Sequence, residues 1–285
     1  MSNSYKISFK QLQQESLKDT FQSIYKAMQA LDIDFYLIGA VARDTWFAQK
    51  GSRALGTRDV DFAVLVANEN SYDELKQFLI QQEGFAESST NEYVLFDKAG
   101  QQIDLLPFGA IEIEGNRFID NTGVIHTNIS GFKEVYEAAT DEVNFEGEYD
   151  FKVSSLAGII LLKLIAYDDR PEMRSKDIQD IGTILNNYFT LENEMILDKH
   201  IDLIADAKKW ELVSARVIGR EMQPILDRNS LLKERVLAII DNNTSSAEES
   251  NIGRLLLGVI NQSPLALEEV FSLLKEIRKG IEDEW

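Results

Sequence analysis

Two carboxylates, Asp59 and Asp61, stand two residues apart in the apolar run DVDFAVLV, residues 59–66. This pattern predicts a buried strand, and because successive side chains of a strand point to opposite faces, both carboxylates lie on one face. Two neighbouring carboxylates repel each other unless a cation lies between them. Mg²⁺ is the hard, oxygen-seeking cation that fits such a pair. An Asp-x-Asp triplet alone is more often part of a loop or a strand end, so the surrounding sequence has to decide.

The residues before this pair add a site for an anion. Residues 35–38, FYLI, predict a short buried strand, and Gly39 then lets the backbone turn and begin a helix that runs to Gln49. Free N–H groups and the helix dipole make a helix N-terminus favourable for phosphate, so Gly39 and Ala40 are candidate phosphate contacts. A phosphate-binding turn one strand away from an acidic pair can hold a metal–triphosphate.

The spacing of Gly39-Ala40 and Asp59-Val60-Asp61 resembles that of the nucleotidyltransferase superfamily, which includes the polymerase-β-like enzymes. Ala40 stands where that superfamily usually has Gly or Ser, which removes a hydroxyl but keeps the backbone donors. The run GAVARD, residues 39–44, also looks like the opening of the tRNA CCA-adding enzymes. The run TRDVD, residues 57–61, is more similar to the AbiEii/AbiGii-type abortive-infection toxin nucleotidyltransferases.

The resemblance implies a third acid on a later strand, and Asp104 in the run IDLL, residues 103–106, matches it in placement. The residues alone leave Asp104 equally well an edge-strand acid that faces solvent. We expect Asp59, Asp61 and Asp104 to hold two Mg²⁺ ions, with Asp104 as general base or metal ligand beside the acceptor hydroxyl. The reaction expected is transfer of a nucleoside monophosphate from an NTP to an acceptor, with release of pyrophosphate.

Three cationic residues are candidates for neutralising the triphosphate: Arg43, Arg58 and Lys163. Arg43 could instead be an ordinary residue of a helix surface. Lys163 interrupts the apolar run LAGIILLKLIAYDD, residues 156–169, where it either snorkels to the surface or contacts phosphate. With Asp177 and Asp180 it resembles a second block of the abortive-infection family, although these acids could also form plain surface salt pairs.

Composition restricts the partners. The formal charge is −19, from 48 acidic and 29 basic residues. This charge argues against broad nucleic-acid binding, which needs a basic face. The acceptor stays open between a small molecule, a protein and a tRNA, and the resemblance adds an antitoxin protein as a partner. The chain has no cysteine, no apolar leader and no apolar run of membrane-spanning length, so we expect a cytoplasmic protein without a membrane partner.

The pattern along the chain predicts an α+β fold: a nucleotidyltransferase-type mixed-sheet domain over residues 1–150, then an all-helical domain over 151–285. Further expectations are an amphipathic helix within residues 9–31, a helix from Ser71 to Gln82 with Ser71 as N-cap, and two hairpins, one joining 93–96 to 103–106 and one around Gly115-Asn116. Three other functions compete: a tRNA-nucleotide-adding enzyme, a nucleotide-binding regulator without catalysis, and an acidic scaffold. Metal-dependent consumption of NTP separates the enzymes from the other two.

Overall fold

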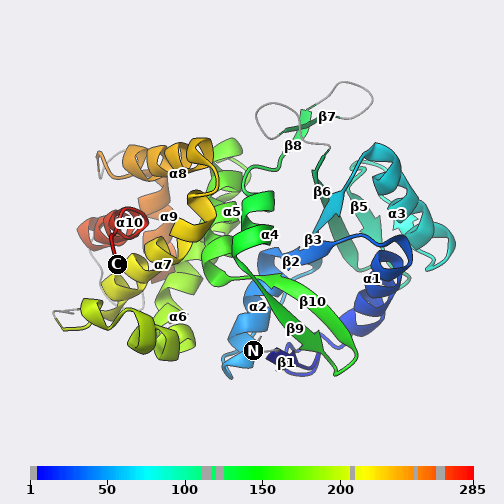
Figure 1. Ribbon diagram of the computed structural model, residues 1–285, viewed down its shortest axis with the longest axis horizontal. Helices are drawn as coiled ribbons and strands as arrows, with labels where there is room; N and C mark the ends of the chain where they lie inside the picture. The colour runs from blue at the N-terminus through cyan, green and yellow to red at the C-terminus, as the bar shows by residue number, and fades with distance from the viewer. Residues whose placement is uncertain (1–4, 111–116, 120–124, 206–208, 247–249, 261–266) are drawn as a thin grey trace. The chain divides into compact units, whose positions relative to one another are not determined.

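The computed structural model describes residues 5–110, 117–119, 125–205, 209–246, 250–260 and 267–285 (Figure 1). The chain divides into two compact units, Met1–Ser155 and Leu156–Trp285. The first unit contains a mixed β-sheet with helices, and the described elements of the second are all helical, so the predicted α+β fold class is confirmed. Within the described ranges, no helix is long and apolar enough to cross a membrane.

Eight described strands of the first unit form one sheet in the order β1-β9-β10-β2-β3-β6-β5-β4. The elements of this unit are β1 (Tyr5–Ile7), α1 (Leu17–Leu31), β2 (Phe35–Ile38), α2 (Gly39–Gln49), β3 (Asp59–Val66), α3 (Glu69–Gln81), β4 (Ala86–Glu87), β5 (Val94–Phe96), β6 (Gln102–Gly109), β7 (Arg117–Ile119), β8 (Ile125–Asn128), α4 (Phe132–Ala138), β9 (Thr140–Phe145) and β10 (Tyr149–Ser154). Because β10 pairs with both β9 and β2, the sheet continues past Asp150 and the first unit ends at Ser155.

The centre of the sheet is built from β2, β3 and β6. Strand β2 is antiparallel to β3, and β3 is parallel to β6. The C-terminal end of β2 therefore lies beside the N-terminal end of β3, and β6 begins at the same edge. Strand β5 pairs with β6 in antiparallel fashion, as the sequence predicted for the hairpin between residues 93–96 and 103–106.

Aromatic side chains pack on both faces of this sheet. On one face the ring of Phe21 from α1 lies 5.6 Å from that of Phe62. On the other face Tyr136 of α4 lies 5.8 Å from Tyr36 and 5.7 Å from Phe108. Helix α3 lies next to α1 (Figure 1). Both faces of the central strands are thus covered along part of their length, which holds these strands in a fixed register.

Three local predictions need correction or lie outside the description. Helix α3 begins two residues before Ser71, and its N-cap is Asn68, whose side chain accepts a 3.0 Å hydrogen bond from the backbone N–H of Ser71. The N-terminal helix begins only at Leu17, because residues 9–13 and 15–16 form turns. The hairpin predicted around Gly115-Asn116 lies outside the described residues. The strand β7, which follows those residues, pairs with β8.

The second unit consists of α5 (Leu156–Asp169), α6 (Ser175–Lys199), the short 3₁₀ helix η1 (Ile201–Leu203), α7 (Trp210–Leu226), α8 (Ser230–Asn242), α9 (Asn251–Ile260) and α10 (Leu267–Ile281). Helices α7 and α10 approach each other closely at two glycines. A Cβ on Gly219 would lie 2.1 Å from the carbonyl oxygen of Ile277, and one on Gly280 would lie equally close to that of Arg216. Glycine at both positions therefore allows the two backbones to touch.

Candidate active site

The strand register brings the three predicted acids to one face of the sheet. Asp61 of β3 is paired with Asp104 of β6, and Asp59 is paired with Gln102. Because directly paired residues on neighbouring strands share a face, as do residues two apart on one strand, all four side chains start from the same face. We call these four residues the acidic patch. It lies at the edge where β3 and β6 begin, on the sheet face that α4 covers further along.

The turn at Gly39 closes one side of the acidic patch. Ile38, the last residue of β2, is paired with Asp61. Gly39 has a φ of +69°, and a Cβ at this position would lie 2.1 Å from Oδ2 of Asp61. Glycine is therefore required here for two reasons: the positive φ of the backbone, and the close approach of the Asp61 carboxylate. The carboxylate of Asp61 thus lies against the first turn of α2, to which Ala40 also belongs.

Gln102 is the member of the acidic patch that the sequence did not single out. Its Nε2 donates a 2.8 Å hydrogen bond to Oδ1 of Asp104. Asp61, Gln102 and Asp104 are half-buried, while Asp59 is exposed. The period-two alternation of β6 could have identified Gln102, because it stands two residues before Asp104 and must share its face.

The acidic patch fits Mg²⁺ in residue type and backbone placement. Carboxylate oxygens are the ligands that Mg²⁺ prefers, and Gly39 leaves room for that of Asp61. The side chains do not converge, however: in the described part of the chain, no group of three or more His, Cys, Asp or Glu is close enough to hold a metal ion. Mutual repulsion favours such separation of neighbouring carboxylates. The metal site therefore stays a prediction.

The two arginines occupy different settings. Arg43 is only 2% exposed, and its Nε and Nη2 donate to Oδ1 of Asp44 at 2.9 and 2.7 Å. The alternative that Arg43 is a helix-surface residue is therefore wrong. Oδ2 of Asp44 accepts a 2.9 Å hydrogen bond from the N–H of Gly56, so this pair fastens the loop that leads into β3. Arg58 is exposed and directly precedes Asp59.

Lys163 belongs to the second unit, unlike the other predicted site residues. Its Nζ lies 2.7 Å from Oδ1 of Asp177 and 2.7 Å from Oδ2 of Asp180, and only 11% of its side chain is exposed. Burial lowers the pKa of Lys163, but the two carboxylates outweigh this effect and raise it above its usual value. The snorkelling alternative is therefore wrong, because the ammonium is held inside the unit. A contact of Lys163 with nucleotide stays a prediction.

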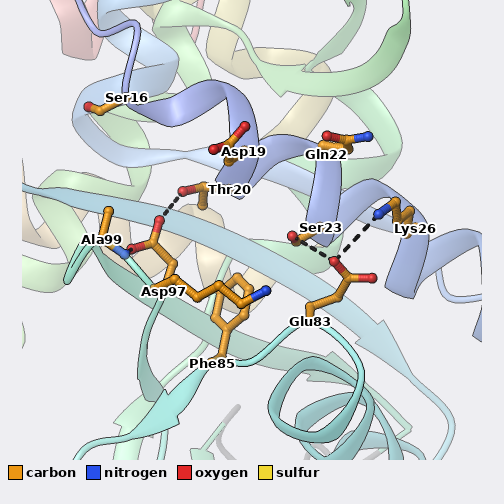
Figure 2. Close-up of a pocket in the computed structure, with 11 residues that line it drawn as sticks. Ser16, Asp19, Thr20, Gln22, Ser23, Lys26, Glu83, Phe85, Asp97 and Ala99 are labelled. Carbon is orange, nitrogen blue, oxygen red and sulfur yellow. Dashed lines mark hydrogen bonds and ion pairs between the residues drawn. The ribbon is translucent and has the colours of Figure 1, made fainter.

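A separate cavity of about 390 Å³ lies between α1, the segment around Glu83 and the turn that joins β5 to β6 (Figure 2). Its polar groups largely bind one another. Thr20 donates to Asp97, Ser23 donates to Glu83, and Lys26 forms an ion pair with Glu83. No member of the acidic patch lines this cavity, so the cavity is separate from the candidate active site.

Comparisons with known proteins bear on the family to which this chain belongs. The model of the family described as nucleotidyl transferase AbiEii toxin, type IV TA system, matches residues 56–248. The match includes the three acids and Lys163 but begins after Gly39, Ala40 and Arg43. A search for similar curated proteins finds no match.

Three solved structures are distantly similar. The antibiotic-resistance factor ANT(2'')-Ia is 14% identical, with a TM-score of 0.35 over 67% of this chain and 90% of the other. A CCA-adding enzyme in complex with ATP is 12% identical, with a TM-score of 0.32 over 94% and 81%. The Thermotoga maritima CCA-adding enzyme complexed with tRNA is 12% identical, with a TM-score of 0.26 over 96% and 83%. Likenesses this distant carry no argument, whereas the family match spans more than half of the chain. The chain therefore belongs to the AbiEii family of nucleotidyltransferases.

Proposed function

We propose that this nucleotidyltransferase is Mg²⁺-dependent and moves a nucleoside monophosphate from an NTP to a hydroxyl of an acceptor. One observation carries the proposal: β3 pairs with β6 in the register that sets Asp61 beside Asp104, with Asp59 two residues along the same face. This register puts three carboxylates at neighbouring backbone positions of one sheet edge, where a cation between them would offset their repulsion. Their proximity to a helix N-terminus supplies an anion site next to a cation site.

In this proposal Asp59, Asp61 and Asp104 hold two Mg²⁺ ions. When bound, such ions orient the triphosphate, increase the acidity of the attacking hydroxyl and stabilise charge in an in-line displacement. Asp61 is the central residue, because it is paired with Asp104 and touches the turn at Gly39. Asp104 lies beside Asp61 on the neighbouring strand and would accept the proton of the acceptor hydroxyl or ligate the ion next to it.

The phosphates would lie at the start of α2. The backbone N–H groups of Gly39 and Ala40 are among the first of that helix, which are the groups a helix leaves unpaired. Arg58 is exposed next to Asp59 and can neutralise phosphate charge. Arg43 would act through its bond to Asp44, by holding the loop in place.

Lys163 would contribute one hydrogen bond to the nucleotide. An ammonium has three donors, and Asp177 and Asp180 each lie 2.7 Å from it. A phosphate contact would use the third donor while the acids keep the amine charged.

The family description supports a toxin role, with an antitoxin protein as the opposing partner. A labelling experiment can identify the class of molecule that accepts the nucleotide. We propose to incubate the protein with α-labelled NTPs, Mg²⁺ and cell lysate, and to repeat the reaction with purified tRNA in place of lysate. Label should enter one acceptor class, and EDTA should prevent it.

The variant that tests the chemistry is Asp61→Asn, since an amide is a poor substitute for a charged Mg²⁺ ligand. Asp73→Asn is the matched control, because Asp73 is an exposed acid of α3 outside the patch. Asp61→Asn should lose transfer while it melts at nearly the wild-type temperature, and Asp73→Asn should keep transfer. Near-normal transfer by Asp61→Asn would refute the proposed mechanism.

A further inference from the structure

We propose that Gln102 is a positioning residue that sets the orientation of the Asp104 carboxylate, an inference that rests on the proposed function. The direct observation is the 2.8 Å hydrogen bond from Nε2 of Gln102 to Oδ1 of Asp104. The bond joins residues two apart on β6, both half-buried and on the acidic patch. A hydrogen bond to one oxygen of a carboxylate restricts rotation of the group about its Cβ–Cγ bond, and so limits where its other oxygen can lie.

The acidic patch needs such a donor. Asp59 and Asp61 on β3 face Gln102 and Asp104 on β6, so three positions of the patch carry carboxylates and one carries an amide. Mutual repulsion turns the three carboxylates away from one another. An amide N–H holds Asp104 without bringing a charge of its own, and so does not compete with a bound cation. A Glu at this position would add a fourth negative charge, and a Leu would offer no donor.

Groups that hydrogen-bond to metal ligands typically change metal affinity or activity by about 10–100-fold when they are removed. We expect this range for Gln102→Leu, which keeps the strand backbone and approximate side-chain size but deletes the donor. The Michaelis constant for NTP should stay within about twofold, because the NTP-binding groups are untouched. The loss should therefore appear in kcat and in metal binding.

Metal binding can be measured without catalysis, by titrating Mn²⁺ alone and following its electron paramagnetic resonance signal. Gln102→Leu should weaken Mn²⁺ binding, whereas Gln29→Leu, at an exposed position of α1, should not. Gln102→Met keeps the side-chain length and likewise lacks the donor, so it should weaken Mn²⁺ binding too, which covers the case that the leucine variant folds poorly. Equal melting temperatures of variant and wild type exclude a general loss of structure.

The decisive step is a double-mutant cycle with Asp104→Ala. If Gln102 acts through Asp104, Gln102→Leu should have no further effect on Mn²⁺ binding once Asp104 is gone. An equal effect in both backgrounds would overturn the inference, as would unchanged Mn²⁺ binding in Gln102→Leu. Wild-type turnover in Asp104→Ala would instead remove Asp104 from the proposed mechanism, and the inference with it. The Mn²⁺ titrations therefore test the role of Gln102, and the turnover of Asp104→Ala tests the proposed function, so the two can fail separately.

Discussion

Replacing Lys163 with Met should destabilise the helical unit strongly, although the apolar run around this lysine would lead one to expect tolerance. Methionine fills a similar volume among the apolar side chains of α5. The change nevertheless removes the cation that lies 2.7 Å from both Asp177 and Asp180. Two largely buried carboxylates would then lose this cation, while Asp177 keeps an ion pair with the exposed Arg174, whose Nη1 lies 3.7 Å from its Oδ2.

The magnitude follows from burial. Removing one partner of a buried ion pair costs roughly 3–5 kcal/mol, chiefly because the remaining charge stays buried and unpaired. The side chains of Asp177 and Asp180 are 12% and 22% exposed, so they retain some contact with water. We therefore expect the lower end, roughly 3 kcal/mol of unfolding free energy. For a unit of this size, that corresponds to a fall of roughly 10 °C in melting temperature.

Circular dichroism at 222 nm during heating is a suitable assay, since helices dominate the signal. Lys233→Met is the matched control: Nζ of Lys233 lies at a similar distance, 2.8 Å, from Oδ1 of Asp227, but that aspartate side chain is 61% exposed. An exposed pair contributes only about 0.2–1 kcal/mol. The control should melt within about 2 °C of wild type. If Lys163→Met also melts within that range, the argument from a buried ion pair is refuted.

The pH dependence gives a second test of the same pair. The raised pKa of Lys163 means that its stabilising contribution is present below its unfolded pKa and is lost as pH rises through the folded value. In Lys163→Met this loss of stability at alkaline pH should disappear, because the amine that titrates is gone. Adding Asp177→Asn and Asp180→Asn should recover part of the loss at pH 7.

Three further predictions concern other parts of the chain. Gly39→Ala should abolish transfer and lower the melting temperature, because the new Cβ would meet Oδ2 of Asp61 at 2.1 Å and the φ of +69° disfavours it; wild-type activity would contradict this. Asn68→Ala should cost about 1 kcal/mol in urea unfolding by loss of the N-cap, whereas Ser71→Ala should cost much less, since its backbone N–H donates the bond. Asp283→Asn should reduce the acid sensitivity of unfolding: burial raises the pKa of Asp283, but hydrogen bonds from two arginines of α7 outweigh it and lower the pKa, so this stabilisation is lost as pH falls.

The elements around the acidic patch were predictable in detail. The strand Phe35–Ile38, the helix Gly39–Gln49 and the strand Asp59–Val66 begin and end where the sequence placed them. Each has a strong local signal: a short apolar run, a glycine at the turn, or polar and apolar residues in alternation. Helix α3 shows the limit of such signals, because Asn68 and Ser71 are both good N-caps and the sequence does not say which one begins the helix.

The partners of the charged side chains were harder to predict from the sequence. Arg43 is buried through a bond to its neighbour Asp44, which periodicity cannot show. The sequence placed Asp177 and Asp180 on one face of a helix but did not direct that face toward Lys163. In each case the position of a charged group depends on how two elements pack.

The sequence by itself determined which residues can share a face of a strand and where the helix after Gly39 begins, because these follow from backbone geometry over a few residues. The tertiary structure alone decided that Asp61 is paired with Asp104, that Gly39 touches the Asp61 carboxylate, and that Gln102 holds Asp104. Strand order and register arise from contacts between segments far apart in the chain, which a local pattern leaves open. The acidic patch thus depends on the register between β3 and β6. Local sequence patterns could identify its residues as candidates but could not place them together.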